Sequence, residues 1–368
     1  MKVALISPYS DALVGGIINW TKYVVNYHQE HSQDVELRLI YNRHPKGLYG
    51  TGTLFQSLKV GLANYLPVCK EFRKAAKDEN FDVVHVSTSA SFGLFRDLMI
   101  WCTAKKHGVK MCLHMHFGRI PLILNSKGWE AYLFRFLLKR IDSAVVMDMA
   151  SYNALKMHGY NNVSYLPNPL GEDIRKMIEC SSDVKRDEKR VFFAGHITAS
   201  KGVYELVEAC RDIKGVKLDL YGKVLGENTY DELYRLAGEE SEQWLNIPGN
   251  KTMDEVIQAM KSCSVFALPT YSEGFPNVII EAMACGCPIV TTPVGAIPEM
   301  LNIQGGEPCG ICVELKNVVA LKEGLQKVLT DYTYADLLGK RAKERVYEMY
   351  SMPKVWDQLK AIWNSVLS

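Results

Sequence analysis

The sequence predicts an α/β protein built of two doubly wound domains. Short apolar runs alternate with helical segments, and this series occurs twice along the 368 residues. Strands that alternate with helices form parallel sheets with helices on both faces. A chain of this length also exceeds one ordinary domain, which makes two domains the expected number.

The expected elements of the first half begin with a strand at the amino end. The strands are Lys2–Ser7, Asp34–Ile40, Asp82–Ser87, Lys110–His116, Ser143–Met147 and Val163–Leu166. Helical segments between them include Ile17–His31 and Val68–Glu79. Each strand is a short apolar run that starts near a charged or polar residue, as is typical of strands in a parallel sheet.

The second half repeats this order. Its expected strands are Arg190–Ala194, Lys217–Tyr221, Trp244–Ile247, Ser264–Leu268 and Pro288–Thr292. Its expected helices are Gly202–Asp212, Thr229–Glu240, Thr252–Lys261 and Asn277–Ala284.

Proline-rich turns set the expected boundaries. Two prolines and an asparagine in Leu166–Leu170 form a turn that continues neither a strand nor a helix. We therefore expect an N-terminal domain over residues 1–168 and a C-terminal domain over residues 169–351. Pro353 interrupts a helical pattern before the amphipathic segment Lys354–Val366, so residues 352–368 are expected to form a separate C-terminal helix.

Composition favours a globular protein without a membrane span. Apolar residues make up 48% and charged residues 23% of the chain, as in ordinary globular domains. No stretch reaches the roughly 18 uncharged apolar residues that a membrane-spanning helix needs. The first ten residues, MKVALISPYS, are typical of a strand and not of a signal peptide. We expect a cytoplasmic protein.

The net charge of +2 is unevenly distributed. Residues up to Leu170 carry 20 basic and 12 acidic side chains, against 23 and 29 beyond it. The basic half suggests an anionic partner. The basic side chains concerned are Lys70, Arg73, Lys74, Lys77, Lys105, Lys106, Lys110, Arg135, Lys139 and Arg140. They predict peripheral contact with the inner face of a membrane; ordinary solvated helix faces, or attraction between the two domains, are the alternatives.

Ten cysteines are scattered through the chain, mostly within apolar stretches. A large cytosolic protein needs no disulfide framework. Cys285 and Cys287, with Cys309 and Cys312, offer four potential zinc ligands. The first pair has a single residue between its members and leads directly into a strand, which favours buried thiols over a metal site.

The segment from Leu268 to Glu281 is the loop that carries most chemistry. A strand ends at Leu268, a polar turn follows, and Pro276 suits the first position of a helix. A helix N-terminus binds anions, and the amides of Asn277 and Val278 lie there. Glu273 and Glu281 add two carboxylates, which suit a ligand that presents hydroxyl groups as well as phosphate.

Two further loops follow expected strands and contain glycines. Lys201 stands at a helix entry beside Gly202 and supplies a point charge for a phosphate. Gly15 and Gly16 follow the first strand and allow close approach of a ligand to the backbone. A solvated lysine and a plain glycine turn are the alternatives for these two loops.

Three histidines lie on central strands of the first half. His114 and His116 are two residues apart, so both face one side of the sheet, with His116 nearer the loop. No third metal ligand is evident, and we interpret His116 as a hydrogen-bonding group beside the reacting ligand. His85 is interpreted as a core histidine whose nitrogens are satisfied.

These loops together resemble the retaining glycosyltransferases of family 4, which have the GT-B fold. The most specific part is the E-x7-E element from Glu273 to Glu281, within Glu-Gly-Phe-Pro-Asn-Val-Ile-Ile-Glu-Ala-Met-Ala-Cys-Gly-Cys-Pro-Ile-Val. The Gly-Gly turn, the histidine at the end of the fourth strand and the Lys-Gly pair occur in the expected order. The resemblance covers nearly the whole chain and implies two Rossmann-like domains that face each other across a cleft. It also implies that the C-terminal helix of residues 352–368 packs back on the N-terminal domain.

The resemblance implies a role for each residue. Glu281 would bind the ribose hydroxyls of a UDP- or GDP-sugar, and Glu273 those of the transferred sugar. His116 would contact that sugar, and Lys201 would balance the phosphate charge. Backbone groups that would meet the diphosphate belong to Gly15, Gly16, Gly274, Phe275, Asn277 and Val278. Family members usually carry arginine where this chain has His196. The histidine therefore lacks the permanent positive charge of that arginine. The acceptor, a sugar or lipid-linked sugar, would bind the N-terminal domain.

No cofactor and no metal are expected, because the chain contains no Asp-x-Asp motif to hold one. The resemblance implies transfer with retention at the anomeric carbon, in polysaccharide or glycoconjugate biosynthesis. A sugar-nucleotide epimerase or a sugar phosphorylase of the same architecture is the nearest alternative. A nicotinamide oxidoreductase lacks its glycine fingerprint here, and a metal-binding scaffold protein is a more distant alternative. No nucleic-acid partner is expected.

Overall fold

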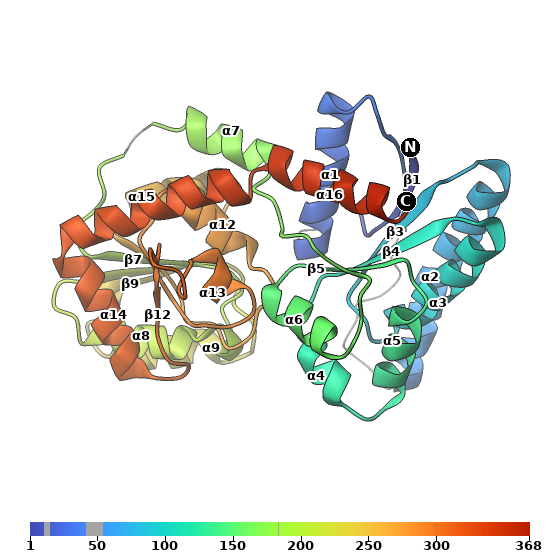
Figure 1. The fold of residues 1–368 in the computed structure, drawn as a ribbon. Helices are drawn as coiled ribbons and strands as arrows, with labels where there is room; N and C mark the ends of the chain where they lie inside the picture. Colours follow the sequence, from blue (N-terminus) through green and yellow to red (C-terminus); the bar gives the residue numbers. More distant parts are fainter. Residues whose placement is uncertain (11–14, 42–53, 183) are drawn as a thin grey trace. The chain divides into compact units, whose positions relative to one another are not determined.

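The computed structural model describes residues 1–10, 15–41, 54–182 and 184–368 (Figure 1). The chain forms two compact units. Unit 1 comprises residues 1–169 and 352–368, and unit 2 comprises residues 170–351. The division lies one residue beyond the boundary that the proline-rich turn suggests. Each unit is described by itself.

Unit 1 contains a six-stranded parallel sheet in the order β2-β1-β3-β4-β5-β6. The strands are β1 (Lys2–Ile6), β2 (Glu36–Ile40), β3 (Val83–Thr88), β4 (Lys110–Met115), β5 (Ser143–Val146) and β6 (Val163–Tyr165). Each lies within two residues of its expected bounds. Val84, Leu113 and Val146 are fully buried, because helices cover both faces of a parallel sheet.

The helices of unit 1 include one from the carboxyl end of the chain. They are α1 (Gly16–His31), α2 (Leu54–Asp78), α3 (Gly93–His107), α4 (Ile120–Asn125), α5 (Trp129–Leu138), α6 (Met149–Met157) and α16 (Met352–Ser365). Helix α16 packs beside α1 (Figure 1), with the ring of Trp356 5.9 Å from that of Tyr27. Lys360 Nζ lies 3.2 Å from Asp34 Oδ2.

Helix α2 is longer than predicted. The sequence predicted a helix over Val68–Glu79. The helix instead runs from Leu54 through Pro67. A proline removes one backbone hydrogen bond, and the buried side chains of Cys69 and Phe72 just beyond it hold the helix against the core. The basic side chains of Lys70, Arg73, Lys74 and Lys77 on this helix are all exposed.

Unit 2 contains a second six-stranded parallel sheet, in the order β12-β11-β10-β7-β8-β9. The strands are β7 (Arg190–Ala194), β8 (Lys217–Tyr221), β9 (Leu245–Gly249), β10 (Val265–Leu268), β11 (Ile289–Thr291) and β12 (Ile311–Cys312). The strand order reverses between β7 and β10. In doubly wound sheets ligands bind beyond the carboxyl ends of the strands at such a switch point.

Helices cover both faces of this second sheet. They are α7 (Glu172–Cys180), α8 (Val203–Arg211), α9 (Thr229–Ala237), α10 (Ser241–Trp244), α11 (Met253–Ser262), α12 (Asn277–Ala284), α13 (Ile297–Met300), α14 (Val318–Thr330) and α15 (Tyr332–Met349), with a 3₁₀ turn at Ala199–Lys201. Helix α11 shows why its start was predictable: Thr252 and Glu255 form a reciprocal capping box. Trp244, predicted in a strand, ends the short helix α10.

Candidate active site

The loops after β7 and β10 meet at the switch point of the unit 2 sheet. Lys201, from the first loop, forms an ion pair with the carboxylate of Glu273, from the second. The Lys201 side chain is 26% exposed and the Glu273 side chain 14% exposed. The structure thus brings together two residues that the sequence singled out in separate loops.

Glycine 202 allows this approach of the two loops. Its φ of +69° lies in the left-handed region, and a Cβ atom there would lie 2.0 Å from the carbonyl oxygen of Pro269. Any other residue would therefore push the loops apart. The amide of Tyr271 also donates a 2.9 Å hydrogen bond to the carbonyl of Ser200. These backbone contacts place Lys201 opposite Glu273.

The Glu273 loop is held from its other side as well. A Cβ atom at Gly295, which has a φ of +55°, would lie 2.3 Å from the Glu273 carbonyl oxygen. The amide of Ala296 donates a 2.9 Å hydrogen bond to the carbonyl of Gly274. The Tyr271 hydroxyl donates a hydrogen bond to the carboxylate of Glu205 on α8. The loop is therefore clamped by two neighbouring segments.

Helix α12 begins directly after this loop. Pro276 is its N-cap and Asn277 its first residue, so the helix starts one residue later than the position suggested for Pro276. Asn277 and Val278 lie in its first turn, as expected. Phe275 is buried and packs edge to face on Tyr350, with ring centroids 5.5 Å apart. This contact fixes the point at which the loop enters the helix.

Glu281 is 7% exposed on α12. Burial raises the pKa of its carboxyl group to about 7, and the negative charge of Asp173 at the start of α7 adds to this increase. Over the described residues, no hydrogen bond or ion pair joins Glu281 to Lys201 or Glu273. The carboxyl group is thus held near the middle of its titration at neutral pH.

His196 follows β7 and is exposed. The backbone beneath it is tightly packed, because a Cβ atom at Gly222 would lie 1.9 Å from the carbonyl oxygen of Gly195. The amide of Gly195 donates to the carbonyl of Tyr221. The His196 side chain therefore stands on a rigid loop at the carboxyl edge of the sheet, with its imidazole accessible.

In unit 1, Gly15 and Gly16 open helix α1 after β1. Gly15 is the N-cap and has an extended backbone, and its carbonyl accepts from the amide of Asn19. A Cβ atom at either glycine would meet nothing within 4 Å in the described part of the chain. The space beside both glycines in the described residues is compatible with close approach of a ligand and with a plain glycine turn. Residues 11–14 of this loop lie outside the described residues.

The three histidines of β3 and β4 lie together. The rings of His114 and His116 have centroids 3.9 Å apart, which confirms that they share one side of the sheet. Both ring nitrogens of His85 are hydrogen-bonded, which confirms its interpretation as a satisfied core histidine. Burial lowers the pKa of His85 and of His116 to about 3. All three imidazoles are therefore neutral.

Several buried polar groups of unit 1 were not predicted from the sequence. Ser7, at the end of β1, lies 2.5 Å from the hydroxyl of Thr21 and donates to Ser87 at 2.9 Å. Arg96 and Asp97 form a buried ion pair after β3. The positions of Ser7, Thr21 and Ser87 in the sequence gave no signal of a site, because short hydroxyl side chains also occur at strand ends for purely structural reasons.

Within the described residues, no group of three or more potential ligands is placed to hold a metal ion. All ten cysteines are free thiols. Cys263 and Cys287 donate to the carbonyl of Met260, which agrees with the interpretation of buried thiols. Among the same residues, none of the helices has the length and apolarity required to cross a bilayer.

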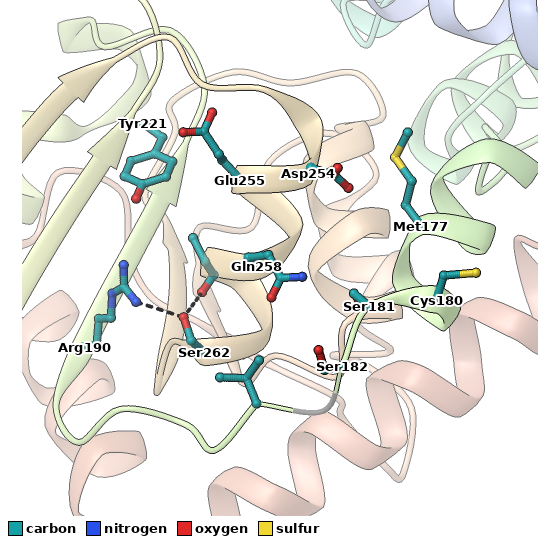
Figure 2. A pocket seen from close by; sticks show the side chains of 12 residues that line it. Met177, Cys180, Ser181, Ser182, Arg190, Tyr221, Asp254, Glu255, Gln258 and Ser262 are labelled. Carbon is teal, nitrogen blue, oxygen red and sulfur yellow. Dashed lines mark hydrogen bonds between the residues drawn. The ribbon is translucent and has the colours of Figure 1, made fainter.

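A hollow of unit 2 lies between α7 and α11 (Figure 2). Arg190, Gln258 and Ser262 line it, and Arg190 donates a 2.8 Å hydrogen bond to the Ser262 hydroxyl. None of the residues predicted to act in the site lines this hollow. The switch point remains the candidate site of unit 2.

Residues 175–345 match the family model described as "Glycosyl transferases group 1". The match lies within unit 2 and includes Lys201, Glu273 and Glu281. The matched segment covers most of unit 2, and the ion pair at the switch point lies within that segment.

Curated relatives share this similarity. The capsular polysaccharide biosynthesis glycosyltransferase CapM of Staphylococcus aureus is 29% identical over 231 residues, which cover 61% of this chain and 58% of CapM. The uncharacterized glycosyltransferase MJ1178 of Methanocaldococcus jannaschii is 24% identical over 324 residues, or 88% of this chain and 84% of MJ1178. The chain therefore spans little more than half the length of CapM.

A solved structure of similar fold is Anabaena Alr3699/HepE in complex with UDP. It has a TM-score of 0.73 at 14% identity and covers 99% of this chain and 100% of that chain. At this identity the likeness concerns the fold. With the two parallel six-stranded sheets, it confirms the predicted GT-B fold.

Proposed function

We propose that this chain is a retaining family 4 glycosyltransferase that moves a sugar from a UDP- or GDP-sugar to a hydroxyl acceptor. The observation that carries the proposal is the Lys201–Glu273 ion pair at the switch point of unit 2. It lies in the segment that matches the group 1 glycosyl transferases. A cation and a carboxylate side by side suit a ligand with both phosphate and hydroxyl groups.

The ion pair supplies a simple means of donor recognition. Lys201 exchanges its carboxylate partner for an oxygen of the diphosphate, and this exchange releases the Glu273 carboxylate to accept from sugar hydroxyls. The first turn of α12, with Asn277 and Val278, adds the positive end of a helix dipole, and Gly274 and Phe275 line the loop that leads into it. Glu281 binds the ribose hydroxyls, and His196 assists the phosphate contact.

The transfer step places negative charge on the leaving diphosphate. The bond from the anomeric carbon to the phosphate oxygen breaks, and its electron pair remains on that oxygen. The acceptor hydroxyl attacks the face from which the nucleotide departs, and its proton passes to the departing oxygen. Lys201 and the α12 N-terminus stabilise the charge from fixed positions. The step requires no metal ion or other cofactor.

Unit 1 supplies Gly15, Gly16 and His116 for the donor and binds the acceptor. CapM is named for capsular polysaccharide biosynthesis, and we extend to this chain a role in polysaccharide or glycoconjugate synthesis. The acceptor is then a sugar or a lipid-linked sugar. This proposal needs unit 1 to reach an acceptor at the cytoplasmic face of a membrane.

The surface of unit 1 supports peripheral membrane contact. Trp129 and Tyr132 on α5 are 47% and 73% exposed, and Phe95 on α3 is 42% exposed. Phe95 stacks on Trp129 with ring centroids 5.4 Å apart. Aromatic side chains of this kind favour the interface of a bilayer, and the exposed basic residues of α2 favour anionic headgroups.

Isothermal titration calorimetry with UDP-, GDP- and ADP-sugars tests the donor proposal. We expect binding of one UDP- or GDP-sugar, unaffected by EDTA. NMR of the product should then show the donor's anomeric configuration at the new linkage. Product formation without an acceptor would indicate an epimerase, and a requirement for free phosphate would indicate a phosphorylase. Absence of binding to every nucleotide sugar would contradict the proposal.

A further inference from the structure

A chain of hydrogen bonds links the C-terminal helix to the histidine cluster of unit 1. The indole Nε1 of Trp363, on α16, lies 3.1 Å from Nδ1 of His85 on β3. Nε2 of His85 lies 3.2 Å from Nδ1 of His114 on β4. Trp363, His85 and His114 are all fully buried. Side-chain nitrogens thus join the C-terminal helix to two paired strands of the sheet, β3 and β4.

The donor and acceptor of each hydrogen bond in this series follow from Trp363. An indole nitrogen only donates, so Nδ1 of His85 accepts and carries no proton. His85 is neutral, because burial lowers its pKa, and its single proton is therefore on Nε2. That proton is donated to Nδ1 of His114. His114 is neutral for the same reason, so its own proton is on Nε2.

The chain ends in a donor without an acceptor. Nε2 of His114 is buried and has no hydrogen-bond partner in the described part of the protein. The same holds for both ring nitrogens of His116 and for the indole nitrogen of Trp20. Trp20 lies 4.8 Å from His114 and 5.1 Å from His116 between ring centroids. A buried donor without a partner destabilises the protein, so an incoming oxygen atom that accepts from it would be favoured here.

We propose that Trp363 is a positioning residue, which fixes the His85 and His114 tautomers so that His114 presents its Nε2 proton, beside His116, to an oxygen of the bound ligand. The ligand oxygen is a hydroxyl of the sugar, and this part rests on the proposed function. The tautomer assignment does not. The C-terminal helix thereby acts on ligand recognition through two histidines, although Trp363 itself contacts no ligand.

Substitutions at His85 separate this role from simple packing. His85→Gln retains an acceptor for the Trp363 indole and a donor for His114, whereas His85→Met fills the space without either. We expect kcat/KM for the nucleotide sugar to fall by roughly tenfold or more in H85M, as for loss of an outer partner that orients an imidazole. H85Q should stay near the wild-type value. Equal losses in both variants, or a near-normal H85M, would overturn the proposal.

NMR of protein with ¹⁵N-labelled histidine rings tests the tautomers without any activity. Wild type should show His85 and His114 with the proton on Nε2. Trp363→Phe should release His85 to exchange between both tautomers, whereas Trp356→Phe, on the same helix, should not. A His85 ring protonated on Nδ1 in wild type, or unchanged tautomers in W363F, would contradict the proposal. Lack of nucleotide-sugar binding with the expected tautomers would instead count against the proposed function.

Discussion

The carboxyl edges of the two sheets use different chemistry on the same type of fold. In unit 1 this edge presents neutral groups, namely Ser7 and His114, which are buried, and His116, which is partly buried. In unit 2 it presents the partly exposed charges of Lys201 and Glu273. Neutral buried groups fix the direction of hydrogen bonds, whereas accessible charges meet a charged ligand. Under the proposed function, this contrast assigns the diphosphate to unit 2 and the orientation of hydroxyl groups to unit 1.

Removal of the unit 2 cation should give the largest effect. We expect Lys201→Ala to lower turnover by roughly 10²–10³-fold, similar to loss of one oxyanion donor, because the leaving diphosphate would lose a fixed positive charge. Steady-state kinetics with a saturating donor measure the change. Lys322→Ala is the matched control, since Lys322 on α14 also pairs with a carboxylate, that of Asp212.

The donor-exchange mechanism adds a second criterion for this variant. If Lys201 meets phosphate, K201A should also weaken binding of the nucleoside diphosphate alone, whereas K322A should leave it unchanged. Near-normal turnover of K201A would contradict the proposal that the Lys201 charge stabilises the leaving diphosphate. The proposed difference between the carboxyl edges of the two sheets would then not hold.

Glu281 offers the next largest effect. Its folded-state pKa of about 7 lies above the usual value of 4.5, so the folded protein binds more protons than the unfolded chain between these values. Stability should therefore fall as the pH rises from about 4.5 to about 7 and level off above that. The carboxyl group accounts for about 3 kcal/mol of this fall. Urea unfolding of wild type and Glu281→Gln at pH 5 and pH 8 measures it.

In E281Q this part of the pH dependence should be absent, so the variant gains stability relative to wild type at pH 8. Asp173→Asn should give a smaller change in the same direction, because Asp173 is the lesser cause of the raised pKa. Glu344→Gln, on the exposed face of α15, is the control. If the free energy of unfolding changed with pH in the same way in wild type and E281Q, Glu281 would not have a raised pKa in the folded protein.

Much of the fold could be predicted because strand and helix patterns are local. Strands β7 and β8 match their expected bounds. Two-residue β12 was missed, since so short a strand has no period to detect. The strand order was also not readable, because it depends on which helices cross the sheet. The sequence therefore placed Lys201 and Glu273 at strand ends but could not show that β7 and β10 are neighbours.

The same limit applies to the histidine cluster. The two-residue spacing of His114 and His116 predicted that they share a side of the sheet. Trp363 lies more than 200 residues from both, and no local pattern connects a tryptophan on a C-terminal helix to a strand histidine. Long-range side-chain hydrogen bonds of this kind are specified by tertiary packing and not by sequence period.

The smallest effect is expected at His196, where the unit 2 edge has one permanent charge fewer than the family pattern implies. His196→Arg should tighten nucleoside-diphosphate binding by about fivefold, or about 1 kcal/mol, because the side chain is exposed and solvent weakens the added interaction. The gain should shrink as salt is raised, since exposed charges are screened. Calorimetry at two ionic strengths measures both effects, with His158→Arg, in unit 1, as the control for a change in net charge. If the gain in affinity were independent of salt, or if H158R showed the same gain, His196 would not lie near the phosphates. The charged groups at the carboxyl edge of unit 2 that act on the ligand would then be limited to Lys201 and Glu273.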